Sequence, residues 1–149
     1  MRSPLIHSRH STLIRRSAED VYRFIAVDFF RNYPKWSPEV SELQQVTAGA
    51  MRVGVTGRQV RYDHGYRSEA TFRVTGMTAL RELRFSSVSG PDFDVCYRFE
   101  PAATDTRVRF EFRLRLPLVM FPLRERVANT VEHGSRRVVA NLQALLDPP

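Results

Sequence analysis

The chain is short of several residue types, and each shortage narrows what it can do. Its 149 residues include a single cysteine, Cys96, which excludes an intrachain disulfide and a cysteine-based zinc cluster. Cys96 falls within a predicted strand, so we interpret it as a small packing residue. No apolar run approaches the roughly 20 residues of a membrane span, and the N-terminus lacks the apolar stretch of a signal peptide. We therefore expect a soluble cytoplasmic protein.

Lysine and acidic residues are also scarce relative to arginine. The net charge is +7, and Lys35 is the one lysine, so arginine supplies nearly all of the positive charge. Arginine binds phosphate bidentately, which suits a nucleic-acid partner. However, the arginines are spread through almost every predicted element and often alternate with apolar residues, as on a solvated sheet face. A basic surface-interaction or nucleic-acid-binding module therefore stays a second alternative, while an acidic protein partner or an anionic membrane surface also fits this charge.

What the chain does contain is typical of one globular domain over residues 1–149, with 42% hydrophobic and 26% charged residues. Its clearest pattern lies at 107–116, where apolar residues alternate with arginine and glutamate, as expected for a strand with one buried face. The segment 121–146 then changes to helical spacing, with an apolar stripe made of Val127, Val131, Val138, Leu142 and Leu145. We expect this long helix to pack on the sheet.

The remaining segments predict a mainly antiparallel architecture. A first strand at 6–14 is followed by a helix that Ser17 caps and that ends near Phe30, before Pro34 and Pro38. Further strands are predicted at 40–46, 51–62, 66–75, 82–85 and 93–100, and the turns between them contain Gly, Pro or Asp. Short hairpin connections imply antiparallel neighbours, so about seven strands form one sheet.

Several of these segments occur in an order that resembles the polyketide cyclase/dehydrase group of the START-like (Bet v 1-like, SRPBCC) superfamily. The resemblance runs from about Ile6 to Leu146 and is carried by Ile14, the helix start at 17–21, Tyr33-Pro34-Lys35-Trp36-Ser37-Pro38, Val53-Gly54, Gly90-Pro91, Thr106-Arg107-Val108 and the final helix. The chain departs from the group at Arg16-Ser17, where a small residue followed by proline is common.

The resemblance implies an α+β helix-grip fold, in which a curved antiparallel sheet wraps around a long C-terminal helix and encloses a hydrophobic cavity. Members of the group bind lipids, sterols, polyketides or other apolar molecules, and some cyclise or dehydrate a bound chain. We expect this chain to bind a hydrophobic small molecule such as a lipid, polyketide or isoprenoid, whose burial is favourable by about 25 cal/mol per Å². The candidate ligand-binding residues are Trp36, Phe72, Val74, Phe85, Tyr97, Phe99, Phe110, Phe112 and Val131.

An aromatase/cyclase or dehydratase activity is the alternative. Tyr62, His64 and Tyr66 surround one predicted hairpin and offer an acid and a base, although Asp63-His64-Gly65 also fits a plain turn. Arg58 and Arg67 on the adjoining strands are candidates for holding a substrate oxygen if they face inward, but the outer face of the sheet, which the alternation also allows, is the favoured place for both.

No motif for a cofactor is present, and a strand places His7 and His10 on opposite faces, which argues against a shared metal.

Three features leave two interpretations each. Trp36 either stacks on a ligand at a cavity rim or plugs the base of the first helix. The apolar run 116–123, which includes Leu118 and Phe121, either forms a portal or membrane contact, or caps the core. Gly134, within the last helix, either leaves volume between helix and sheet or is merely tolerated.

Overall fold

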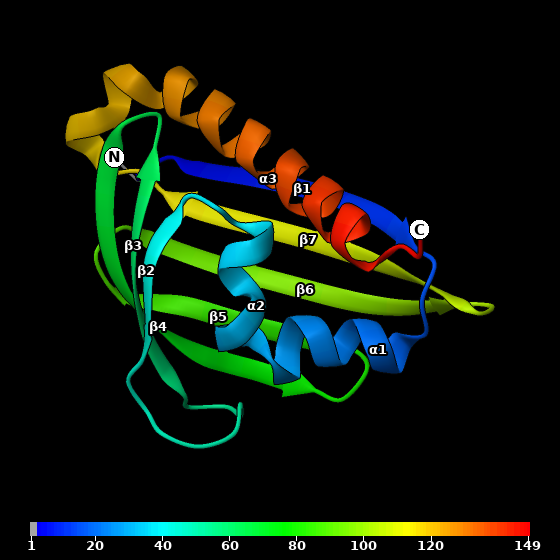
Figure 1. Ribbon diagram of the computed structural model, residues 1–149. Coiled ribbons are helices and arrows are strands. Elements are labelled where there is room, and N and C mark those ends of the chain that lie inside the picture. The colour runs from blue at the N-terminus through cyan, green and yellow to red at the C-terminus, as the bar shows by residue number, and fades with distance from the viewer. Residues whose placement is uncertain (1–2) are drawn as a thin grey trace.

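A seven-stranded antiparallel sheet is the centre of the molecule, and its helices all lie on one face (Figure 1). The computed structural model describes residues 3–149. The strands follow the order β1-β7-β6-β5-β4-β3-β2. From β2 to β7 each strand therefore pairs with the next one in the sequence, and β1 pairs with β7 at the edge of the sheet. Their bounds are Leu5–Ile14 (β1), Val40–Gln45 (β2), Thr56–Asp63 (β3), Tyr66–Thr78 (β4), Glu82–Ser89 (β5), Asp92–Ala102 (β6) and Asp105–Arg115 (β7).

The helices occupy the concave face of this sheet. They are α1 (Ala18–Tyr22), the π-helical turn η1 (Arg23–Val27), α2 (Phe29–Trp36), the 3₁₀ helix η2 (Leu118–Leu123) and α3 (Arg124–Leu146). The α+β helix-grip architecture predicted from the sequence is therefore confirmed. Among residues 3–149, no helix combines the length and the apolar character that a bilayer crossing demands.

The last strand in the sequence, β7, follows its predicted alternation. Val108 and Phe110 are buried on the concave face, whereas Arg109 and Arg113 are exposed on the convex face. β7 pairs along its whole length with β1 on one side and β6 on the other, so its apolar face is continuous with theirs.

The first helical segment begins as predicted and ends later. The Ser17 hydroxyl accepts a hydrogen bond from the Asp20 backbone N–H at 3.2 Å, which caps α1. The predicted end near Phe30 was wrong, because α2 continues to Trp36 with Pro34 inside it. Proline removes one backbone hydrogen bond, but Tyr33 and Trp36 on either side of it are buried, and this packing outweighs the loss.

Two other predicted boundaries also shift. The strand predicted at 51–62 begins only at Thr56, because Gly54 has a positive φ of 97° and the Val55 N–H closes a turn onto the Arg52 carbonyl. The helix predicted at 121–146 begins as α helix at Arg124, and the residues before it form η2.

The core is an aromatic cluster between α2 and the sheet. Its members are Phe29, Tyr33, Trp36, Phe72, Phe85 and Tyr97, each at most 4% exposed. The rings of Phe29 and Tyr33 stack with centroids 4.6 Å apart, and the Trp36 Nε1–H donates to the Tyr97 hydroxyl at 3.1 Å. Trp36 therefore plugs the base of the helical segment and does not lie at a rim.

Two glycines give opposite predictions for the same substitution to alanine. A Cβ on Gly57 of β3 meets ring atoms of Phe72 at 2.5 Å and Phe30 at 2.7 Å, so Gly57→Ala is expected to destabilise the protein by about 1–3 kcal/mol. A Cβ on Gly134 of α3 meets nothing within 4 Å, so Gly134→Ala is expected to stabilise it by up to about 1 kcal/mol. Urea unfolding of both variants measures the two changes in the free energy of unfolding. Equal changes in the two variants would contradict the packing described for these glycines.

Candidate functional site

The long helix covers the sheet unevenly along its length. Every residue that α3 buries lies at or after Ser135. In its first half, Val127 and Val131 lie on the same side of the helix as that buried stripe but are only half-buried. Phe112 and Leu114 on the concave face of β7 are half-buried as well. We call this partly covered region, beneath the first half of α3, the open end.

An arginine reaches the concave face close to the aromatic core. Arg61 lies on β3, and its Nε and Nη2 atoms donate to the two Asp63 carboxylate oxygens at 3.0 Å each. On the same side of β3, the buried Gln59 accepts a hydrogen bond of 2.9 Å from the Tyr33 hydroxyl through its Oε1 atom. This set of side chains, Tyr33, Gln59, Arg61 and Asp63, is termed the arginine network below.

The ionisation states of the arginine network follow from its surroundings. Burial raises the pKa of the Tyr33 hydroxyl, and the adjacent Arg61 opposes this only in part. Burial also works against the charge on Arg61, but the neighbouring Tyr33 and Asp63 raise its pKa overall. At neutral pH the network therefore presents a protonated phenol and a cationic guanidinium.

A second polar group lies on the other side of the concave face, where α3 meets β1. Glu132 accepts hydrogen bonds from His10 Nε2 at 2.6 Å and from the Ser8 hydroxyl at 3.1 Å. In the β1–β7 register, His10 stands opposite Phe110 and Ser8 stands opposite Phe112. The apolar surface of β7 thus lies next to an imidazole–carboxylate pair.

The hairpin residues proposed as acid and base are on the outside. Tyr62 is 46% exposed, Tyr66 is 65% exposed, and His64 is exposed as well. His64 and Gly65 both have positive φ, which is the geometry of a tight two-residue hairpin turn. The cluster is therefore a turn, and it does not assemble an enclosed acid/base site.

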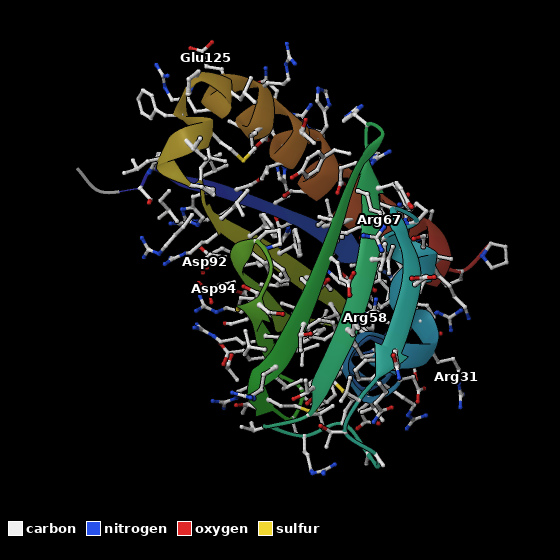
Figure 2. The ribbon with its side chains drawn as sticks, turned by 90° about the vertical axis from the view of Figure 1, so that its left-hand side faces the viewer. Arg31, Arg58, Arg67, Asp92, Asp94 and Glu125 are labelled. Carbon is white, nitrogen blue, oxygen red and sulfur yellow. The ribbon has the colours of Figure 1, made fainter. Side chains whose placement is uncertain are left out.

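The arginine candidates Arg58 and Arg67 lie on the outer face of the sheet, where neither reaches the concave side. Arg58 on β3 and Arg67 on β4, both labelled in Figure 2, pair with the exposed Glu69. The inward-facing cation is Arg61. Hydrophobic alternation gives no signal for Arg61, because the apolar Val60 lies on the opposite side of β3 and is itself buried.

Most of the predicted ligand-binding residues belong to the core. Phe72, Val74, Phe85, Tyr97, Phe99 and Phe110 are all at most 5% exposed, as is Trp36. Phe112 and Val131, by contrast, are half-buried at the open end. These two are the predicted residues that a bound molecule reaches without displacing the aromatic cluster, and their contact with a ligand stays a prediction.

Two hollows of about 390 and 260 Å³ lie on the convex face of the sheet. Both have Cys96 and Arg98 in their lining and are mainly polar. Burial raises the pKa of the Cys96 thiol, which suits a packed residue more than a nucleophile. Neither hollow corresponds to the closed apolar cavity that the family resemblance implied, because the aromatic core fills the concave side beneath α2.

The contact between α3 and β1 is expected to weaken in acid. Burial raises the pKa of Glu132, but the hydrogen bonds from His10 and Ser8 outweigh it and lower the pKa below the usual glutamate value. A carboxylate with a lowered pKa stabilises the fold above its unfolded-state pKa, and this contribution is lost as the pH falls through the folded-state value.

Glu132→Gln should therefore reduce the free energy of unfolding at neutral pH, and the difference from the parent protein should vanish in acid. Urea unfolding across this pH range measures the effect. Glu125→Gln is the matched control, since Glu125 lies on the same helix and forms no ion pair within residues 3–149. If the difference in the free energy of unfolding between Glu132→Gln and the parent protein persists unchanged into acid, the ionised Glu132 does not stabilise the contact between α3 and β1.

Comparison with known proteins agrees with this fold. Residues 6–147 match the family described as "Polyketide cyclase / dehydrase and lipid transport". None of the curated proteins matches the chain.

Among solved structures, TTHA0849 from Thermus thermophilus has a TM-score of 0.80 at 19% identity, with 94% of this chain and 96% of that chain covered. The Zhui aromatase/cyclase from Streptomyces sp. R1128 has a TM-score of 0.79 at 14% identity, covering 96% and 94%. A START superfamily protein from Mycobacterium smegmatis has a TM-score of 0.77 at 13% identity, covering 94% and 96%.

At these identities the solved structures establish the fold alone, whereas the family match spans nearly the whole chain. With its seven-stranded sheet, its long C-terminal helix and this match, the chain belongs to the polyketide cyclase/dehydrase and lipid transport family.

Proposed function

We propose that the protein binds a hydrophobic small molecule that carries a polar or anionic group, and that the molecule lies at the open end beneath the first half of α3. The observation that supports this most is the uneven cover of the sheet, which leaves Phe112, Leu114, Val127 and Val131 half-buried between two elements that face each other. The burial of such apolar surface by a ligand is favourable, because it removes the surface from water.

The energy and the orientation of binding come from different residues. Apolar contact contributes about 25 cal/mol for each Å² removed from water and has no preferred direction. The arginine network supplies direction, because Arg61 keeps a charged guanidinium on the concave face while Asp63 holds it in place. A carboxylate, an enolate or a keto oxygen is the group that such a guanidinium recognises.

Anilinonaphthalene sulfonate, an apolar probe with one anionic group, tests this directly by fluorescence titration. Arg61→Met is expected to weaken its binding about tenfold or more, because a charge-assisted hydrogen bond is lost. Arg58→Met is the matched control, since Arg58 lies on the same strand, pairs with Glu69 and faces the convex side. It should leave the affinity unchanged.

A second variant separates loss of the anchor from loss of the apolar surface. Val131→Trp fills the open end and should abolish probe binding while the far-ultraviolet circular dichroism stays as in the parent protein. Native mass spectrometry of the freshly purified protein, followed by organic extraction, then identifies any natural ligand. The proposal is wrong if the parent protein does not bind the probe, or if Arg58→Met and Arg61→Met lower the affinity equally.

Cyclase or dehydratase chemistry is the second candidate function. The observation that favours it is the His10–Glu132 pair, which adjoins the apolar face of β7 and offers a proton acceptor on the same side as the Arg61 guanidinium. Incubation with a linear poly-keto thioester and mass analysis of the products tests it, because each ring closed by aldol condensation and dehydration releases one water. Product that forms in the parent protein and not in His10→Ala supports catalysis, and unchanged substrate in both supports a carrier.

A further inference from the structure

The exposed apolar side chains of this protein gather at one end of the sheet. Within residues 3–149, fourteen large hydrophobic side chains are exposed, and eight of them lie on η2, at the start of β1, or at the ends of β3, β4 and β5. These parts of the chain come together at the same end of the molecule (Figure 1). We call the eight residues the apolar collar: Leu5, Tyr62, Tyr66, Val88, Leu118, Val119, Phe121 and Leu123.

The most prominent part of the collar is η2. Its sequence, Leu-Val-Met-Phe-Pro-Leu, is wholly apolar, yet none of its residues is buried and Val119 is 87% exposed. Capping of the core, one of the two interpretations that the sequence left open, is instead the role of Leu116, which is 2% exposed. An exposed apolar helix of this kind has a cost in water unless another surface covers it.

The charges around η2 indicate what that surface is. Arg115 precedes the helix, and Arg124 and Arg126 follow it; none of the three forms an ion pair within residues 3–149. The Arg124 guanidinium lies over the Phe121 ring, 4.1 Å from its centroid. Two carboxylates are near, Glu125, which points outward from the start of α3, and Asp92, which stands opposite Arg115 (Figure 2).

The opposite side of the collar has amphipathic aromatic residues. Tyr62 and Tyr66 extend from the β3–β4 hairpin, each with an apolar ring and a polar hydroxyl. Tyrosine and arginine around a small apolar tip are the combination found where proteins meet the interface of a lipid bilayer, because the rings sit at headgroup depth and the cations attract anionic lipid. The protein's overall charge of +7 adds long-range attraction to the same surface.

We propose that the apolar collar docks on the surface of an anionic bilayer, with Leu118, Val119 and Phe121 entering the interface and Arg115, Arg124 and Arg126 meeting lipid phosphates. Docking places the open end against the membrane, so an apolar ligand passes between bilayer and protein without crossing bulk water. This inference goes beyond ligand binding itself, and vesicle binding measures it whether or not a soluble ligand is found.

Co-sedimentation with vesicles tests the proposal. The parent protein is expected to bind vesicles of phosphatidylcholine mixed with phosphatidylglycerol, to bind phosphatidylcholine alone far more weakly, and to be released by salt. Val119→Asp should lower the binding about tenfold or more. Val53→Asp is the matched control, because Val53 is 59% exposed but precedes β3, whose other end carries the collar. It should bind like the parent protein.

The arginines are tested separately. Arg124→Gln combined with Arg126→Gln should lower binding to the anionic vesicles by about tenfold and leave the weak binding to phosphatidylcholine unchanged. Three results overturn the proposal: no binding of the parent protein to anionic vesicles, an equal loss in Val119→Asp and Val53→Asp, or a dimer in size-exclusion chromatography that Val119→Asp dissociates. The last result assigns the collar to a second copy of the chain.

Discussion

The packing of α2 against the concave face is the interaction on which the rest of the structure depends. Phe29, Tyr33 and Trp36 come from one short helix and meet Phe72 and Phe85 from the sheet, so a single aromatic cluster holds the two layers together. The Trp36–Tyr97 hydrogen bond satisfies the indole N–H, which would otherwise be costly in so apolar a place. No buried side-chain donor or acceptor in residues 3–149 lacks a partner, which is what a core this dry requires.

The aromatic cluster also limits where a ligand can bind on the concave face. It fills the concave side of the sheet beneath α2. The first half of α3 buries none of its residues, so the concave face has a closed core beneath α2 and a partly accessible surface beneath the start of α3. Arg61 lies beside the closed core, bound to Asp63 and next to Tyr33, whose hydroxyl donates to Gln59. A charged group is tolerable there because its partners share the partly buried position, and the same partners keep its side chain in one orientation.

Much of the architecture could be predicted from alternation and helical spacing, and the failures have physical causes. The strict alternation in β7 and the Ser17 cap were reliable because each depends on local geometry. The helix end was misplaced at Pro34 because tertiary packing overrode a local preference, and Arg61 could not be found from alternation because the two sides of β3 both contain buried residues, Gln59 and Val60. Whether the aromatic residues line a space or fill it depends on how distant segments meet, and a single sequence does not contain that information.

The position of β1 at the edge of the sheet sets the order in which the molecule can be completed. Its ladder is with β7, and the sequence places almost the whole sheet between the two. α3, which follows β7 in the chain, is in turn tied to β1 through Glu132 and through the Gln143 amide, which donates to the Leu13 carbonyl. During synthesis, β1 leaves the ribosome before β7 and α3, so its Ile6 and Ile14 side chains stay uncovered until both of those elements have been made. The β1–β7 ladder joins residues that are far apart in the sequence, and such pairings are slow to form.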